Sequence, residues 1–169
     1  MNRPNAEDCA PFYGKYIALV NDDPILETLE KLKISTYDFF CSLTEEQANH
    51  AYAEGKWTIK EVAGHLTDAE RTFAYRAFAF SRRQGELPGF DENEYVETAT
   101  FNTRTLQDLA AEFKTTREAN LYMLLALTED QLNIVGIANG SSIKVNSILY
   151  IMAGHELHHL NILKERYLA

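Results

Sequence analysis

The chain has 169 residues, of which 46% are hydrophobic and 24% are charged. These proportions are typical of a globular protein, and the length fits one domain that buries a core without disulfide or metal crosslinks. Acidic residues outnumber basic ones by 25 to 16, so the net charge is −9. This charge argues against nucleic acid and against an anionic membrane surface as partners, because both bind clustered Lys and Arg.

The cysteines and the N-terminal residues indicate the compartment. Cys9 and Cys41 are isolated, without CxxC spacing, which favours free thiols in a reducing cytosol over a disulfide framework. Residues 1–14 lack the apolar segment of a signal peptide, and no apolar run reaches the roughly 18 residues that cross a membrane. We therefore expect a cytoplasmic protein with one domain over 1–169, in which residues 1–20 form an irregular lead-in.

Four segments carry apolar residues with the 3.6-residue period of an amphipathic helix. Helices of about 24 residues would be about 36 Å long, which suits a four-helix bundle and hence an all-α fold. No segment has a convincing strand pattern. The predicted helices cover about 24–41, 58–83, 104–127 and 143–168, and their predicted N-caps are Asp23, Thr58, Thr103 and Ser142.

The connections between these helices are long. Residues 42–57 and 128–141 exceed a tight antiparallel turn, and each is expected to contain a short helical turn. Residues 84–102 form the longest connection. Long connections permit a crossover, in which consecutive helices need not alternate in direction.

A short motif occurs twice in the chain. LTEEQAN at 43–49 matches LTEDQLN at 127–133, which begins 84 residues later. The same offset aligns TIK at 58–60 with SIK at 142–144. Common capping chemistry is the simpler explanation. Because the two segments keep one register through the loop, duplication of a two-helix unit is more attractive, and it would place the second and fourth helices in equivalent positions of the bundle.

The tripeptide AGH also occurs twice, at 63–65 on the second predicted helix and at 153–155 on the fourth. Glycine inside a helix costs about 1 kcal/mol relative to alanine, and it is tolerated where a backbone or a ligand must come close. His155 and His159 are four residues apart and share one helix face. From the other helix, His65 can also point into the core.

Inward-facing imidazoles are costly to bury unless their nitrogens find partners. A metal ion takes one nitrogen from each ring, and three ligands leave a position open for water or substrate, as in a catalytic site. The alternatives are a hydrogen-bonded core histidine at His65 and a chance pair on an exposed helix at His155 and His159. We expect His158 to face a neighbouring helix or solvent, and His50 to lie on the surface.

Other residues near these histidines are candidates for supporting roles. Asp68 and Glu156 would either orient an imidazole or be solvated carboxylates on helix faces. Among the arginines of the second helix, Arg76 continues the His65 face and is the best candidate to hold a substrate carboxylate. Surface positions are expected for Arg71, Arg82 and Arg83, and core positions for Trp57, Phe73, Tyr75 and Phe80.

Three stretches resemble motifs of one known family. KWTIKEVAGHLTDAER at 56–71 resembles the first motif of the DinB/YfiT-like family of metalloenzymes. LPGFD at 87–91 resembles a loop of one branch of that family, and GHELHH at 154–159 resembles its closing motif. The resemblance covers about residues 20–168 and implies a four-helix bundle.

The resemblance also implies a site and an activity. One divalent metal, zinc or nickel, would be held by His65, His155 and His159, in a homodimer. Better-understood members are thiol S-transferases that use low-molecular-weight thiols such as bacillithiol, or a mycothiol-dependent isomerase. An open metal site lowers the pKa of a bound thiol, or activates water for hydrolysis.

We therefore expect a metal-dependent thiol S-transferase, or a related hydrolase, that acts on a small-molecule substrate. A low-molecular-weight thiol would be the cosubstrate of the transferase. Two alternatives come from other classes of protein. One is a non-catalytic metal-binding or stress-response protein, and the other is a helical dimerisation module with structural histidines.

Overall fold

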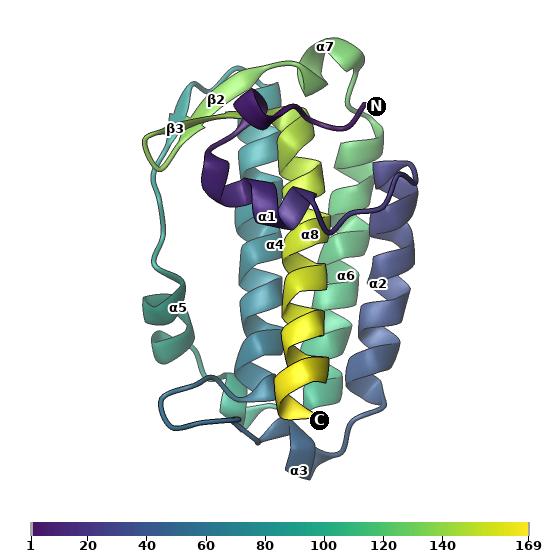
Figure 1. Cartoon of the computed structure of the whole chain (residues 1–169), viewed down its shortest axis with the longest axis vertical. Coiled ribbons are helices and arrows are strands. Elements are labelled where there is room, and N and C mark those ends of the chain that lie inside the picture. The colour runs from purple at the N-terminus through teal and green to yellow at the C-terminus, as the bar shows by residue number, and fades with distance from the viewer. Residues whose placement is uncertain (1, 169) are drawn as a thin grey trace.

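In the computed structural model, which describes residues 2–168, four long helices pack side by side as a bundle (Figure 1). They are α2 (Ile25–Cys41), α4 (Ile59–Ser81), α6 (Leu106–Leu125) and α8 (Val145–Ile162), and α8 continues into a π-helical turn, η4 (Leu163–Tyr167). The predicted all-α four-helix bundle is confirmed. Within residues 2–168, no helix is both long and apolar enough to cross a membrane.

The helices are connected with a crossover. α2 and α4 follow one another in the chain, yet each packs against both α6 and α8, so they lie diagonally opposite. Residues 82–105 return along the outside of the bundle, and α6 therefore runs in the same direction as α4 (Figure 1). This segment carries β1 (Glu86–Leu87), α5 (Glu92–Thr98) and η3 (Phe101–Thr103). As a result, α4 and α8 are antiparallel neighbours.

A small sheet at one end of the bundle shows that the prediction of no strands was wrong. β2 (Val135–Ala138) and β3 (Ser141–Lys144) pair antiparallel, and β1 pairs parallel with β2. Asn139 and Gly140 join β2 to β3 with φ angles of 51° and 72°, and positive φ at both central residues is what a type I′ hairpin turn requires. The predicted helix cap Ser142 therefore lies in a strand, and α8 begins after it.

Capping side chains set the starts of α4 and α6. The hydroxyl of Thr58 accepts a hydrogen bond from the backbone amide of Glu61, and the Glu61 carboxylate accepts one from the Thr58 amide. This capping box confirms the predicted start of α4. α6 begins later than predicted, because Thr105 is its N-cap and Thr103 lies in η3.

The repeated motif folds the same way at both of its positions. α3 (Glu45–Ala48) and α7 (Glu129–Leu132) are the short helical turns expected in the connections, and each begins with a Thr–Gln capping box, at Thr44 and Thr128. The equivalence ends there, because α4 begins directly after its cap whereas the matching segment before α8 is the strand β3. Local capping chemistry accounts for the part of the repeat that the structure preserves.

The first 20 residues fold back onto the bundle. They form η1 (Ala6–Asp8), η2 (Pro11–Tyr13) and α1 (Gly14–Ile17), so the irregular lead-in contains short helical turns. α1 lies across α8 and buries the side chain of Tyr16 against it (Figure 1). This segment therefore forms part of the surroundings of α8.

A buried ion-pair network links all four long helices. Arg117 of α6 is 1% exposed, and its guanidinium lies 2.9 Å from a carboxylate oxygen of Glu70 on α4 and 2.8 Å from one of Glu156 on α8. Thr36 of α2 donates to Glu156 over 2.5 Å, and Asn120 donates to Glu70 over 2.9 Å. Buried charges need such partners, and this network connects α4 to α8 through Arg117.

Candidate metal centre

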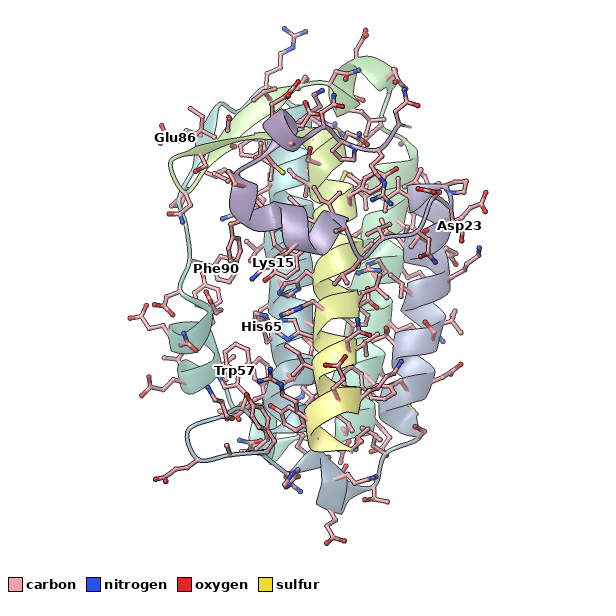
Figure 2. All side chains as sticks on the ribbon, viewed as in Figure 1. Lys15, Asp23, Trp57, His65, Glu86 and Phe90 are labelled. Carbon is pink, nitrogen blue, oxygen red and sulfur yellow. The ribbon has the colours of Figure 1, made fainter. Side chains whose placement is uncertain are left out.

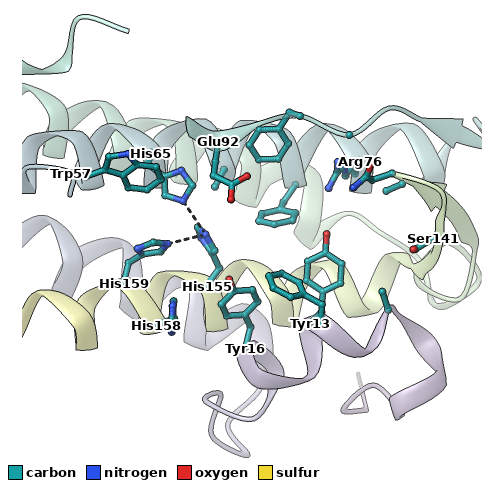
Figure 3. Close-up of a pocket in the computed structure, with 18 residues that line it drawn as sticks. Tyr13, Tyr16, Trp57, His65, Arg76, Glu92, Ser141, His155, His158 and His159 are labelled. Atoms are coloured by element: carbon teal, nitrogen blue, oxygen red, sulfur yellow. Dashed lines mark hydrogen bonds between the residues drawn. The ribbon is translucent and has the colours of Figure 1, made fainter. Parts of the chain in front are cut away.

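The three histidines singled out from the sequence meet between α4 and α8. The Nε2 atom of His155 lies 3.1 Å from that of His65 and 3.2 Å from that of His159 (Figure 3). One nitrogen from each ring lies within 4.8 Å of the others. Their role as metal ligands stays a prediction, but the structure brings the three rings together through the atoms that would bind an ion.

The glycine before each AGH histidine makes room for a segment that crosses the bundle. A Cβ atom at Gly64 would lie 2.4 Å from the ring of Phe101, and one at Gly154 would lie 2.0 Å from the backbone oxygen of Tyr16. Neither position can carry a side chain without a shift of its neighbour. The repeated tripeptide thus reflects close packing of η3 against α4 and of α1 against α8, beside the histidines.

Burial keeps the three imidazoles neutral. His65 is 4% exposed, His155 is 8% exposed, and His159 is partly buried. Desolvation lowers the pKa of His65 to about 4 and that of His159 to about 3. Desolvation and the neighbouring imidazoles also hold the pKa of His155 well below its usual value. Neutral imidazole is the form whose nitrogen binds a metal, so the cluster is ready for one at pH 7.

The donor set fits an open divalent-metal site. A neutral imidazole has one acceptor nitrogen, and the rings converge through Nε2, so a shared cation satisfies all three nitrogens better than hydrogen bonds among them. Among residues 2–168, no Cys, Asp, Glu or further His belongs to this group. Three protein ligands leave a coordination position open, whereas structural zinc sites are normally closed by four.

The cluster lines a cavity of about 410 Å³, which is the size of a small-molecule site. In Figure 2, Trp57, His65 and Phe90 lie between the bundle and the segment that carries α5. The walls come from α4, α8, the N-terminal segment, the segment after β1 and the β2–β3 hairpin. Besides the three clustered histidines, they include Tyr13, Tyr16, Trp57, Phe73, Arg76, Phe90, Glu92, Asn139, Ser141 and His158.

The remaining two histidines lie outside the cluster. His158 is partly buried, and its ring packs edge-on against Tyr16 with the centroids 5.3 Å apart, at the cavity wall. His50 is exposed, as expected, and its ring lies 6.2 Å from that of Tyr167. Neither residue belongs to the group of converging nitrogens.

The two carboxylates proposed to orient an imidazole do not do so. Glu156 is buried against Arg117 and Thr36, so it is neither a support for His155 nor a solvated group. Asp68 lies 3.5 Å from Arg71. The partners of Glu156 therefore lie on α6 and α2, and the partner of Asp68 lies three residues along α4; neither carboxylate has a histidine as its partner.

Arg76 is the one α4 arginine at the cavity. It is 4% exposed, whereas Arg71, Arg82 and Arg83 are exposed. The predicted core positions hold for Phe80 and Phe73, which are 0% and 5% exposed, although Phe73 also lines the cavity. Tyr75 is 53% exposed, and Trp57 is only partly buried at the cavity wall.

Several cavity residues carried no signal in the sequence. Tyr13, Tyr16 and Glu92 lie in short segments without helical periodicity, and their positions depend on how those segments fold back. Phe90 belonged to the LPGFD stretch, which was the only sequence feature that pointed to this wall.

Two known proteins and one family model are similar to this chain. A curated protein from Oceanobacillus iheyensis, named as a candidate metal-dependent hydrolase, is 28% identical over 126 residues, which is 73% of this chain and 72% of that protein. The structure of YfiT from Bacillus subtilis, described as a probable metal-dependent hydrolase with an unusual four-helix bundle topology, matches with a TM-score of 0.75 and 20% identity. The match covers 86% of this chain and 87% of that one. The family model of the DinB superfamily matches residues 29–163, most of the chain, and the protein therefore belongs to the DinB superfamily.

Proposed function

We propose that this protein is a metal-dependent hydrolase of small molecules, with one divalent metal held by His65, His155 and His159. The observation that carries the proposal is the convergence of three neutral imidazoles at the wall of a cavity large enough for a substrate. The descriptions of the two relatives as metal-dependent hydrolases support the same class of reaction.

Zinc and nickel are the metals that we propose, because imidazole nitrogens suit both. When bound, such a metal supplies Lewis acidity, which polarises a substrate carbonyl or phosphoryl group and lowers the pKa of a water molecule.

Glu92 is the proton acceptor that we propose for the reaction. It is the only carboxylate among the described residues that line the cavity, and Figure 3 shows its side chain extending into that cavity. A carboxylate in this place can take the proton of an attacking water and return it to the leaving group. Trp57 and Phe73 contribute apolar side chains to the wall of the same cavity.

Thiol S-transfer is the second candidate activity. It would use the same open position, with a low-molecular-weight thiol in place of water as the nucleophile. The descriptions of the relatives favour water. The metal site, the cavity and Glu92 have the same roles in both reactions.

The test uses protein purified without a histidine tag and loaded with zinc or nickel. It is assayed against a panel of esters, thioesters and amides, with and without an added thiol. We expect hydrolysis without thiol, and a loss of more than about 100-fold in His155→Ala, because even residues that only support metal ligands change activity by about 10- to 100-fold. His50→Ala, an exposed histidine outside the cluster, is the matched control.

Each other outcome selects a different function. Turnover that requires the thiol would make the protein a thiol S-transferase. Stoichiometric metal without turnover across the panel would make it a metal-binding or stress-response protein, and failure to bind metal would favour a helical module with structural histidines.

We further propose that the protein works as a homodimer in the cytoplasm, without nucleic acid or membrane partners. The net charge of −9 supports the absence of these polyanionic partners. Sedimentation at micromolar concentration tests the oligomeric state.

A further inference from the structure

We propose that Arg76 binds a carboxylate group of the substrate, so that the protein acts on carboxylate-bearing molecules with an apolar body. This inference rests on the proposed function, because it assigns the ligand of the same cavity. Arg76 and His65 lie on the same helix, 11 residues apart, which corresponds to about 16 Å along its axis. Figure 3 shows them toward opposite ends of the cavity.

Among residues 2–168, two arginines are deeply buried, and they differ in their partners. Arg117 is 1% exposed and has carboxylate oxygens of two glutamates within 3 Å. Arg76 is 4% exposed, and among residues 2–168 no carboxylate lies within 4.0 Å of it. Its guanidinium makes one hydrogen bond within the described chain, to the backbone oxygen of Pro88 over 3.3 Å.

A buried guanidinium is costly unless an anion and several acceptors surround it. Around Arg117 the protein itself supplies both the anions and the hydrogen-bond acceptors. Arg76 lines the cavity, and the neighbouring loop supplies its guanidinium with only one carbonyl. The missing counter-charge is therefore expected from a molecule in the cavity, and a carboxylate matches the fork of guanidinium donors in geometry and charge.

The aromatic rings around Arg76 define the rest of the ligand. The guanidinium carbon lies 5.9 Å from the ring centroid of Phe73 and 5.8 Å from that of Phe90, so the two rings confine it. Tyr13 and Tyr16 continue this apolar lining toward the histidines. An aromatic or aliphatic body would lie along these rings, with its carboxylate at Arg76 and its reactive bond at the histidines.

The charge of the site favours a carboxylate over a phosphate. Arg76 is the only arginine or lysine among the described residues that line the cavity, and Glu92 adds a negative charge at the other end. A phosphate monoester carries a charge of about −1.5 to −2 at pH 7, which a single guanidinium does not balance. A carboxylate carries one charge and pairs with one guanidinium.

The test measures binding and needs no turnover. Zinc-loaded protein is titrated with 4-phenylbutanoate, with the neutral 4-phenylbutanamide and with phenyl phosphate. Binding is followed by calorimetry and by the fluorescence of Trp57, the single tryptophan, which lines the same cavity. The variants are Arg76→Gln, Arg76→Lys and, as matched control, Arg82→Gln, which removes the exposed arginine that follows the last residue of α4.

We expect the wild type to bind the acid about 10- to 100-fold more tightly than the amide, as charge-assisted hydrogen bonds imply. The preference should disappear in Arg76→Gln, persist in part in Arg76→Lys, and be unchanged in Arg82→Gln. Equal binding of acid and amide by the wild type would overturn the proposal, and this comparison needs no variant. Phenyl phosphate bound more tightly than the carboxylate would overturn it as well.

A carboxylate could also bind at the histidines, and His65→Ala separates the two sites. A preference for the acid that survives Arg76→Gln but disappears in His65→Ala would overturn the proposal. The result of the binding titration does not depend on whether the protein catalyses hydrolysis. Arg76-dependent binding without hydrolysis of any ester would contradict the proposed function alone, whereas hydrolysis without Arg76-dependent binding would contradict this inference alone.

Discussion

The Nε2 atoms of His65 and His155 lie 3.1 Å apart, although 90 residues separate them in the chain. Their contact depends on the crossover, because the return of residues 82–105 along the bundle leaves α4 and α8 as antiparallel neighbours. His159 completes the group from one turn farther along α8. The site is thus a property of the topology, and changes that disturb the pairing of α4 with α8 should disturb it.

The buried ion-pair network is expected to hold that pairing. Arg117→Met leaves Glu70 and Glu156 buried without their cation, and we expect the free energy of unfolding to fall by about 3–5 kcal/mol. Chemical denaturation measures the loss. Arg104→Met is the control, because Arg104 pairs with Asp108 over 2.6 Å and also with Glu112 at a partly exposed site, where each pair contributes at most about 1 kcal/mol.

Removing all three charges of the same network together gives a second test of its role. Replacing Glu70 and Glu156 by Met together with Arg117→Met removes the buried charges as a set, and most of the lost stability should return. A triple variant as unstable as Arg117→Met would show that the loss came from packing and not from the unpaired carboxylates.

Gly154 should not tolerate a side chain. Its Cβ would lie 2.0 Å from the backbone oxygen of Tyr16, so Gly154→Ala must displace α1. Overpacking costs about 1–3 kcal/mol, whereas alanine gains about 1 kcal/mol of helix propensity, and we expect a net loss in the free energy of unfolding. Gly14→Ala is the control, because no atom lies within 4 Å of its Cβ position. Equal stability of the two variants would contradict the packing described here.

The metal-free protein should lose stability in mild acid. The pKa of His65 is lowered to about 4 by burial, while in the unfolded chain it returns to its ordinary value of about 6.5. Below that value the unfolded state binds a proton that the folded state does not. The free energy of unfolding therefore falls by up to about 1.4 kcal/mol for each pH unit between about 6.5 and 4, and the contribution is fully present above pH 7.

Denaturation of chelator-treated protein at several pH values checks this dependence. The difference between wild type and His65→Leu isolates the histidine from the carboxylates, which titrate alike in both proteins. A His65→Leu slope equal to that of the wild type would contradict the assignment of a buried neutral imidazole.

Glu92 is expected to act in the reaction and not in metal binding. Glu92→Gln should lower kcat by about 100- to 10,000-fold, the range for loss of a general base, and leave zinc affinity unchanged. Steady-state kinetics with any substrate from the hydrolase panel measures the effect. Glu94→Gln changes an exposed carboxylate on the same short helix that does not line the cavity, and it should retain activity. Equal activity of both variants would remove Glu92 from the mechanism.

Features that repeat with the helical period were predictable from the sequence. The four long helices follow from apolar residues at a spacing of 3.6, and His155 with His159 shares a face because four residues make about one turn. The capping box of Thr58 and Glu61 is equally local. These features need no knowledge of which segments meet.

Features that depend on distant segments were not predictable. The β2–β3 hairpin contains an Asn-Gly turn, but its strands are short and β1 joins them from a distant segment, so no alternating pattern marks them. Arg117 has the sequence surroundings of a surface residue, and only the approach of Glu70 and Glu156 buries it. The cavity walls likewise come from segments distant in the chain, among them the N-terminal segment and the crossover, that fold back onto the bundle.

The most direct test of the account is the metal stoichiometry of protein purified without a histidine tag. After zinc is added and excess ion is removed by gel filtration, mass spectrometry of metals should find one zinc per chain in the wild type. His155→Ala should retain far less than one, while His50→Ala should match the wild type. One zinc per chain in His155→Ala, or none in the wild type, would contradict a metal site formed by His65, His155 and His159.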